Sequence, residues 1–534
     1  MKKNGWRWAA ACIALLIIIP LAVVLASLFS PEREVWRHLL DYVLPGLLGN
    51  TLRLALGVTV GVILLGVSLA WLTAVCEFPG RRFFSWALLL PLAVPAYVTA
   101  FVYVALLDFT GPLQTWLRDV GGDSIPFPAI RSAGGVIMVM SLALYPYVYL
   151  LARNAFLTQG RRALEVAQSL GYSRKAGFFR VALPLARPWI MSGLLLALME
   201  TLADFGTVSV FNYDTFTTAI YKTWFGMFSL TGASQLASVL ILLVFALIAA
   251  EQFSRRGMHF TQAGHHTRVE RVVLRGHHAW LASGFAALVL LVAFGIPVVQ
   301  LLAWAGKVVA QDLDARYLGF LWHSLLLGGA AAVLVVMTAL VLTYAQRQHN
   351  DRWTQAIVRV ATLGYAVPGA VLAVGIVIPL AWFDQQLVSV VSDWFGIETG
   401  LILQGTILVM LLAYLIRFLA VGYNPVDNAM QRVTRNLDEV ARSFGMGGFA
   451  ILRRVHLPML RGGLLTAAAL VFVDVMKEMP ITLMTRPFGW DTLAVRIFEM
   501  TSEGEWERAA LPAVALVLVG LLPIALLIRQ SEKT

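Results

Sequence analysis

The sequence predicts an all-α integral membrane protein with about twelve transmembrane helices, arranged as two six-helix repeats of parallel topology. Three observations support this fold class. Of the 534 residues, 59% are hydrophobic and only 13% are charged, whereas about a quarter of the residues of a soluble globular protein are charged. Twelve apolar stretches are long enough to span a bilayer, and one polar motif occurs once in each half of the chain.

Each predicted span is a run of roughly 20 mainly apolar residues, enough to cross about 30 Å of hydrocarbon. The first six spans are predicted at 8–29, 51–75, 83–107, 134–157, 189–211 and 234–253. The second six are predicted at 280–305, 323–345, 356–380, 401–423, 461–485 and 510–529. Basic residues precede the first run, as in a signal peptide. That run is longer than a secretory apolar core and no clear small-x-small cleavage site follows it, so we expect an uncleaved span.

The basic residues predict the topology, because Lys and Arg accumulate in short cytoplasmic loops. With the N-terminus inside, the inside segments hold about three times as many Lys and Arg as the outside loops. We therefore expect both termini to be cytoplasmic. The net charge of +11 then reflects orientation in the membrane, and nucleic-acid binding is not expected.

A polar linker, 254–279, separates a first half (1–253) from a second half (280–534). It contains five arginines and five histidines: His259, His265, His266, His277 and His278. A metal site is one interpretation, but no Cys or acidic partner lies at ligand spacing and the arginines would repel a cation. We interpret the segment as a solvated cytoplasmic linker and assign no metal. Cys12 and Cys76 lie in or beside apolar runs and are interpreted as small core residues rather than a disulfide.

The repeated motif lies in the loops after the fourth and tenth spans, 158–188 and 424–460. The first copy reads Glu165-Val-Ala-Gln-Ser-Leu-Gly171 and continues to Pro184, and the second reads Glu439-Val-Ala-Arg-Ser-Phe-Gly445 and continues to Pro458. The spacing from Glu to Gly and from Gly to Pro is the same in both copies, which are offset by 274 residues. A weaker repeat, Ala-Val-Pro, ends at Pro95 in the third span and at Pro368 in the ninth. We expect these prolines to kink helices near the pathway, with local backbone repair as the alternative.

The loop residues predict a short amphipathic helix on the cytoplasmic face. Val166, Ala167 and Leu170 fall on one helix face, and Val440, Ala441 and Phe444 repeat this pattern. The glycine is suited to a helix end and the proline to the start of the next span, while the glutamate lies near the start of the short helix. The alternative is an interfacial helix lying on lipid headgroups. Identical spacing in two copies favours binding to a soluble protein with two equivalent clefts.

Ionisable residues also occur inside two predicted spans. Glu200 and Asp204 lie one turn apart in the fifth span, and Asp474 and Glu478 repeat this spacing in the eleventh, beside Lys477. Such groups usually face a bundle interior or a water-filled cavity. Two interpretations remain open: four carboxylates in a pathway suited to a hard cation, or structural pairing in which Lys477 pairs with one carboxylate and the others bond neighbouring helices or hold a gate shut.

The two loops resemble the EAA loops of bacterial ABC-importer permeases, and the resemblance covers nearly the whole chain. By that resemblance the motif positions are Glu165, Ala167, Gly171 and Pro184, and Glu439, Ala441, Gly445 and Pro458. The second position differs from the family pattern, with Val166 and Val440 in place of Ala. The fusion of two halves, with Glu200-Thr-Leu-Ala-Asp204-Phe-Gly and Lys477-Glu478-Met-Pro, resembles the ferric-iron branch of the family.

The resemblance implies a type I importer fold in a bacterial cytoplasmic (inner) membrane, with two coupling helices that dock on a separate ATPase dimer. No G-x-x-x-x-G-K-[ST] motif occurs in the chain. We therefore expect a transport subunit that is not itself an enzyme and has no cofactor of its own, ATP and Mg²⁺ being bound by the ATPase. An extracytoplasmic substrate-binding protein and membrane lipid are the other expected partners. Thiamine, sulfate or polyamine are alternative substrates, and an ion-coupled secondary transporter is the more remote alternative.

Overall fold

The computed structural model describes residues 3–29, 33–121, 127–160, 165, 167–254, 271–349, 351–395 and 400–532. In this part of the chain, 12 helices are long and apolar enough to cross a membrane. They are Gly5–Phe29, Trp36–Val75, Ala96–Gly121, Ala133–Thr158, Lys175–Ala203, Leu230–Phe253, His277–Asp312, Ala315–Gln348, Gly369–Trp394, Ile407–Gln431, Gly448–Lys477 and Trp506–Ala525. Each overlaps one predicted span, so the predicted fold class is confirmed.

The helices of the first half follow the order of the predicted spans, with short helices between them. They are α1 (Lys3–Ala26), α2 (Arg33–His38), α3 (Leu44–Val75), α4 (Arg81–Ala87), α5 (Ala96–Leu107), α6 (Pro112–Gly121), α7 (Ala133–Ala155), α9 (Arg174–Gly177), α10 (Leu183–Ala203), α11 (Gly206–Val210), α12 (Phe216–Tyr221) and α13 (Leu230–Ser254). Tighter or wider turns extend several of them: η1 (Ser27–Phe29), η2 (Leu39–Val43), η3 (Leu90–Ala93), η4 (Phe156–Gly160), η5 (Phe178–Ala182) and η6 (Lys222–Gly226).

The second half repeats this order. Its helices are α14 (His277–Leu290), α15 (Ile296–Asp312), α16 (Ala315–Gln348), α17 (Arg352–Ala361), α18 (Gly369–Phe395), α19 (Ile407–Gln431), α20 (Arg435–Ser443), α21 (Gly448–Ile451), α22 (Leu457–Lys477), α23 (Pro480–Thr485), α24 (Leu493–Ser502) and α25 (Trp506–Glu532). Its additional turns are η7 (Leu291–Gly295), η8 (Leu363–Ala366) and η9 (Leu452–His456).

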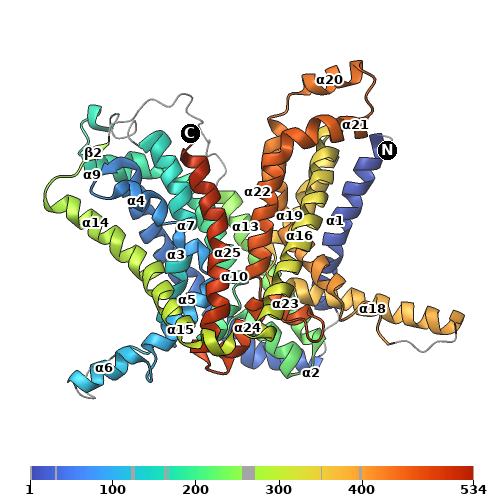
Figure 1. The fold of residues 1–534 in the computed structure, drawn as a ribbon, viewed down its shortest axis with the longest axis horizontal. Helices are drawn as coiled ribbons and strands as arrows, with labels where there is room; N and C mark the ends of the chain where they lie inside the picture. Colours follow the sequence, from blue (N-terminus) through green and yellow to red (C-terminus); the bar gives the residue numbers. More distant parts are fainter. Residues whose placement is uncertain are drawn as a thin grey trace.

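The two ends of the helical bundle differ in shape. Both termini and α20 lie at one end, here called the terminal end, and α2, α6 and α24 lie at the other, here called the opposite end (Figure 1). The two groups of helices lie close together toward the opposite end and spread apart toward the terminal end. Both motif-bearing loops therefore lie at the ends of diverging arms.

Part of the predicted linker is ordered against the first half. Strand β2 (Val272–Val273) pairs in parallel with β1 (Cys76–Glu77), which continues α3, and α14 begins at His277 within the predicted range. The linker residues 255–270, with His259, His265 and His266, lie outside the described residues. The pairing fixes the start of the second half beside α3 of the first.

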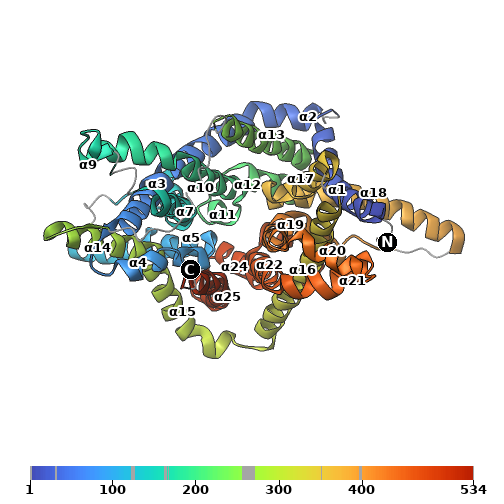
Figure 2. The same ribbon diagram turned by 90° about the horizontal axis from the view of Figure 1, so that it is seen from above.

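The two halves exchange their first spans. α1 packs against α16, α17 and α18, and α14 packs against α4 (Figure 2). Ala14 and Ile17 of α1 are buried in the core of the second half, and Ala286 of α14 is buried in that of the first. The approach of α1 to α18 is close because Gly375 has no side chain, and a Cβ there would lie 2.8 Å from the Pro20 carbonyl oxygen. The halves are therefore interlocked.

The third and ninth spans are broken at the prolines, where we expected kinked helices over 83–107 and 356–380. Helix α4 is followed by η3 and an extended Val94, and α5 starts after Pro95. In the ninth span, α17 is followed by η8 and an extended Val367. The cause is local, since the residue before a proline is disfavoured in the helical conformation. Both breaks leave carbonyl groups without helical partners inside the bundle.

Candidate functional site

A cavity of about 400 Å³ lies between the two halves. Its wall contains all five ionisable residues proposed as pathway candidates in the fifth and eleventh spans: Glu200, Asp204, Asp474, Lys477 and Glu478. The broken third span contributes Leu92 and Pro95, and the tenth span contributes Arg417. The cavity thus lies where the broken helices of both repeats meet.

Two of the carboxylates cap helices at breaks in the fifth and eleventh spans. Sequence reasoning predicted continuous spans over 189–211 and 461–485, but α10 ends at Ala203 and α22 at Lys477. The Asp204 carboxylate accepts hydrogen bonds from the Thr207 hydroxyl (2.9 Å) and the Val208 amide (3.2 Å). Because the first amides of a helix have no helical partner, a carboxylate at that position stabilises the new helix.

Glu478 has the equivalent role in the second half. Its Oε1 accepts a hydrogen bond from the Ile481 amide (3.1 Å) at the start of α23. Its Oε2 lies 3.3 Å from Nε of Arg417, and both side chains are more than nine-tenths buried. Gly369 makes room for this pair, since a Cβ there would lie 2.7 Å from Oε1. Glu478 is therefore a structural carboxylate with a fixed partner.

The two cations of the cavity satisfy the carbonyl groups that the broken spans leave free. Arg417 Nη1 donates to the Val367 carbonyl (2.9 Å), and Lys477 Nζ donates to the Leu92 carbonyl (2.9 Å). Lys477 was expected to pair with a carboxylate, but its direct hydrogen bond goes to the Leu92 carbonyl. Sequence reasoning also missed Arg417, although a lone arginine in the predicted span 401–423 was an available signal.

The remaining two carboxylates are held less firmly. Glu200 accepts a hydrogen bond from the Tyr365 hydroxyl (2.9 Å). Asp474, at the equivalent position of the other repeat, makes no hydrogen bond or ion pair with the described residues. Both line the cavity beside Tyr147. The cavity therefore presents one free carboxylate, one carboxylate held by a phenol, and two that cap helices.

The carboxylates do not form a preformed metal centre. Within the described ranges, no group of three or more His, Cys, Asp or Glu side chains is arranged to hold a metal ion. The four carboxylates are opposed by only two cationic side chains, Arg417 and Lys477, in the cavity wall.

Three aromatic rings separate this cavity from a second one toward the opposite end. Phe205, Tyr221 and Phe498 pack with ring centroids 5.3 to 6.3 Å apart. Phe205 lines the central cavity, and Phe498 lines the second cavity of about 450 Å³. Tyr221 ends α12 in the first half and Phe498 lies in α24 of the second, so both repeats contribute to the barrier.

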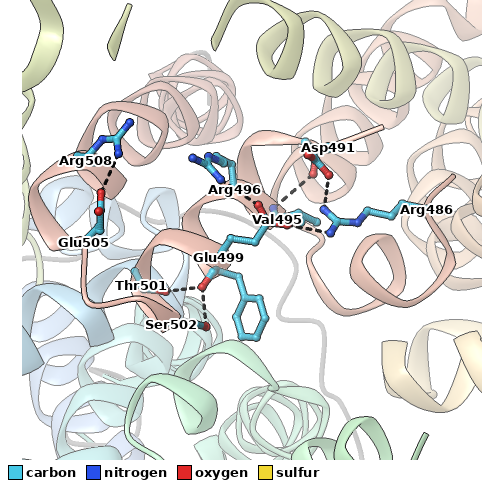
Figure 3. A network of polar contacts seen from close by, with 11 residues as sticks. Arg486, Asp491, Val495, Arg496, Glu499, Thr501, Ser502, Glu505 and Arg508 are labelled. Atoms are coloured by element: carbon cyan, nitrogen blue, oxygen red, sulfur yellow. Dashed lines mark hydrogen bonds and ion pairs between the residues drawn. The ribbon is translucent and has the colours of Figure 1, made fainter. Parts of the chain in front are cut away.

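A network of ion pairs holds α24 in place behind this barrier (Figure 3). Glu499 pairs with Arg486 (2.8 Å) and with Arg496 (3.2 Å), and Arg486 also pairs with Asp491. The helix starts with a side-chain cap, in which the Thr492 hydroxyl accepts from the Val495 amide. The network links the end of α23, which starts at the cavity, to the helix that carries Phe498.

The second motif copy forms α20 at the terminal end (Figure 1). Ala441 is buried, whereas Val440 is 53% and Phe444 79% exposed. The prediction that these apolar residues share one face is therefore wrong. The alanine packs inward, and the two larger side chains are exposed. Glu439 is exposed as well.

The first motif copy matches the second wherever it is described. Ala167 is fully buried and Leu170 is 69% exposed, Glu165 is exposed, and Val166 lies outside the described residues. Gly171 and Gly445 have φ values of +82° and +76°. In both copies the amide after the glycine bonds the motif alanine carbonyl, at 2.9 Å to Ala167 and 3.1 Å to Ala441. This geometry ends a helix and favours glycine.

The prolines of the motif also occupy equivalent positions. Pro184 lies in the first turn of α10 and Pro458 in the first turn of α22, where a missing amide hydrogen leaves no bond unmade. Wider turns, η5 and η9, precede both helices at the same offset. The predicted glycine and proline positions are therefore confirmed as helix ends and helix starts; their role in coupling is a separate question.

A buried ion pair anchors the second motif loop to the transmembrane helices. Asp438 of α20 pairs with Arg347 of α16 (2.9 Å) and with His456 of η9 (2.7 Å). Arg347 also donates to the Val433 carbonyl (2.9 Å). Burial raises the pKa of Asp438, but the hydrogen bonds and charges of Arg347 and His456 outweigh it and lower the pKa below its ordinary value. Asp438 is therefore ionised at neutral pH.

Comparison with known proteins identifies the class to which this architecture belongs. The family of binding-protein-dependent transport system inner membrane components matches residues 63–251 and again residues 336–532. The chain belongs to this family and contains two copies of its characteristic unit. The predicted fused permease with two motif loops is thereby confirmed.

Three individual members of the family are similar in sequence to this chain. The chain is 30% identical to the Fe(3+)-transport system permease protein FbpB 2 of Haemophilus influenzae over 91% of this chain and 90% of that protein. It is 29% identical to the sulfate transport system permease protein CysW of Escherichia coli over 37% of this chain and 66% of that protein. A putative 2-aminoethylphosphonate transport system permease protein, PhnV of Salmonella typhimurium, is 26% identical over 40% and 77%.

Proposed function

We propose that this chain is the transmembrane permease of an ABC importer for ferric iron. The observation that supports this most directly is the acidic central cavity, whose four carboxylates face a single pathway between the repeats. Hard cations prefer oxygen ligands, and Tyr147 and Tyr365 add phenol oxygens to the same wall. The relative that aligns over most of the chain is an Fe(3+)-transport permease.

The motif loops are proposed to couple the permease to a separate ATPase dimer. Each loop exposes apolar side chains: Leu170 in the first copy, and Val440 and Phe444 in the second. Side chains of this kind can insert into an apolar cleft of a partner protein. The glutamates, Glu165 and Glu439, and the buried alanines, Ala167 and Ala441, complete each copy. In this arrangement both termini and both loops are cytoplasmic.

The proposed transport cycle is alternating access. The two groups of helices meet toward the opposite end and diverge toward the terminal end (Figure 1), which corresponds to a pathway open to the cytoplasm. ATP binding would bring the motif loops together, open the barrier of Phe205, Tyr221 and Phe498, and expose the cavity to a loaded binding protein. Asp474 is the proposed first carboxylate to meet the cation, because it has no hydrogen-bond or ion-pair partner in the described part of the chain.

Sulfate and aminoethylphosphonate are the competing substrates suggested by relatives of lower coverage. An oxyanion would be repelled by the acidic wall, since four carboxylates outnumber Arg417 and Lys477 and both cations are occupied by carbonyl groups. Thiamine and polyamines are cationic, so the cavity's charge does not separate them from iron, and they belong in the experiment.

The test is reconstitution of the permease with its ATPase and binding protein in proteoliposomes. We expect uptake of Fe³⁺, and stimulation of ATP hydrolysis by the iron-loaded binding protein, but neither effect with sulfate, thiamine or spermidine. Uptake driven by a proton or sodium gradient without nucleotide would instead indicate a secondary transporter. Stimulation by one of the other substrates would retain the importer and refute iron.

A further inference from the structure

Four arginines gather at the terminal end of the first half, on elements that are separate in sequence. Arg81 and Arg82 start α4, Arg153 lies in the last turn of α7, and Arg271 precedes β2. Glu77 of β1 is the carboxylate that the structure places among them. These elements lie toward the terminal end (Figure 1), where β2 pairs with β1, the continuation of α3. The cluster therefore has a large excess of positive charge.

Contacts among the described residues fix the arrangement. Arg81 Nε and Arg271 Nη1 approach the same oxygen of Glu77, at 3.0 and 3.7 Å. Arg81 also donates to the Thr73 carbonyl (3.4 Å), and the Thr73 hydroxyl bonds the Tyr149 hydroxyl (3.1 Å). Tyr149 lies one turn before Arg153 on α7. The pairing of β1 with β2 thus brings Arg271 toward the end of α7.

Among the described residues, no carboxylate pairs with Arg153. It makes no hydrogen bond or ion pair with the described residues, and its Nε is buried from solvent. Arg271 also has a buried Nε without a hydrogen-bond partner. Burial and the positive charges of Arg81, Arg153 and Arg82 lower the pKa of Arg271, against the opposing effect of Glu77. Removing a guanidinium N–H from water without a hydrogen-bond acceptor is costly, and an anion at this cluster would supply the acceptor.

The cluster is not a general feature of the repeat. The second half places Asp427 where the first has Arg153, and the flanking Asn-Ala pair, Asn154-Ala155 and Asn428-Ala429, is the same in both. The helix end does not therefore require an arginine for its own fold. The cluster is a property of the first half alone.

The cluster lies at the end of a membrane span, since Arg153 is five residues from the end of the candidate span Ala133–Thr158. The indole of Trp71 on α3 packs against Phe156 (5.1 Å) and Phe178 (4.5 Å), and Phe156 follows Arg153 by three residues. Aromatic side chains of this kind collect at membrane interfaces. Basic pockets between helices at the cytoplasmic face are typical sites for anionic lipid headgroups.

We propose that Arg81, Arg153 and Arg271 form a phosphate-binding site at the terminal end of the first half. Guanidinium groups bind phosphate oxygens through paired hydrogen bonds, so the ligand is a phosphate group with at least one full negative charge. Its source is the headgroup of an anionic phospholipid or a soluble phosphate. The bound anion would join α4, α7 and β2, and so fix the start of the second half against the first.

The test is lipid binding to the delipidated full-length chain in detergent, followed by native mass spectrometry. Cardiolipin and phosphatidylglycerol are the probes, phosphatidylcholine is the neutral comparison, and the variants are R153Q/R271Q and R432Q. Arg432 is exposed, lies at the same end in the second half and has no side-chain partner among the described residues, so it is the matched control. We expect the double variant to bind anionic lipid about tenfold more weakly than the wild type and R432Q.

Competition distinguishes the two sources of phosphate. Displacement of the lipid by millimolar inorganic phosphate would identify a soluble phosphate, and failure of displacement would identify the headgroup; both retain the site. Equal binding by the wild type and R153Q/R271Q would overturn it. The variant R153K/R271K guards against misfolding, because it keeps the charge but loses the paired geometry. Its affinity for anionic lipid should lie between those of the wild type and R153Q/R271Q. If it binds as weakly as R153Q/R271Q while circular dichroism shows an intact fold, charge alone does not bind the lipid.

Discussion

At the scale of single residues, the charged side chains of the cavity differ in what they bond. Asp204 and Glu478 are engaged with backbone amides, and Arg417 and Lys477 with backbone carbonyls. These four repair the polar groups that broken helices expose inside the membrane, where an unsatisfied group is costly. Asp474 has no such task. The structural interpretation drawn from the sequence therefore applies to Asp204 and Glu478, and a pathway role is proposed for Asp474 and Glu200.

Replacing Asp474 with Asn should lower ferric-iron uptake by about tenfold or more, since it removes a free charge from the proposed pathway. Assembly with the ATPase should be unchanged. The measurement is Fe³⁺ uptake into proteoliposomes at equal complex content. The control is D393N, in which the lost carboxylate is exposed and lies outside the cavity. Normal uptake by D474N would remove Asp474 from the pathway.

Replacing Arg417 with Met should instead damage stability. It leaves Glu478 buried without its partner and the Val367 carbonyl unbonded, and removal of one member of a buried pair costs roughly 3–5 kcal/mol. Thermal unfolding in detergent should show the loss. The double variant R417M/E478Q should recover part of it, because the unpaired charge is then absent. A single variant as stable as the wild type would contradict a structural role.

At the scale of secondary-structure elements, the sequence predicts what is local and fails where tertiary contacts decide. Gly171, Gly445, Pro184 and Pro458 were placed correctly because helix ends depend on nearby residues. The breaks after Ala203 and Lys477 were missed, since an apolar run of that length is equally consistent with one continuous helix. The partner of Glu478 was also unpredictable, because Arg417 lies on a different span and the two meet only in the folded bundle.

The variant G445V should uncouple the importer. A β-branched residue at φ +76° is strained by roughly 1–2 kcal/mol, and the end of α20 should lose its geometry. We expect ATP hydrolysis to continue while iron uptake falls severalfold, measured in the same proteoliposomes. G447V is the matched control, because Gly447 lies in the same loop at φ −76° with open space around it. Equal effects of the two variants would show that bulk rather than backbone geometry is responsible.

The aromatic barrier makes a second prediction at this scale. The variant Y221C/F498C replaces two rings whose centroids lie 6.3 Å apart. It is made in a background in which Cys12 and Cys76 are replaced by serine. A short cleavable thiol cross-linker should then join the two halves, stop uptake and release it after cleavage. The single variant Y221C, treated in the same way, should keep its uptake. Full transport by the cross-linked protein would show that the barrier need not open.

At the scale of the whole molecule, the sequence repeat and the folded unit do not coincide. The division at 253 and 280 predicts two halves, yet α1 belongs to the core of the second group and α14 to that of the first. Charge patterns and repeats cannot reveal this exchange, because any apolar span of sufficient length can cross the bilayer, whichever helices it packs against. Which helix neighbours which depends on small residues at close contacts, such as Gly375 against Pro20.

The exchange predicts how the protein should tolerate being cut. Fragments 1–262 and 263–534, expressed together, should copurify and transport iron, because each supplies a span that completes the core of the other. Either fragment alone should be degraded or aggregate, since it exposes the surface that the missing span covers. The sharper test deletes residues 3–29 from the full chain and follows protease protection. If α1 serves the second group, cleavage should increase first around α17 and α18, which pack against α1, while α3 and α7 stay protected; loss of protection confined to the first half would refute the exchange.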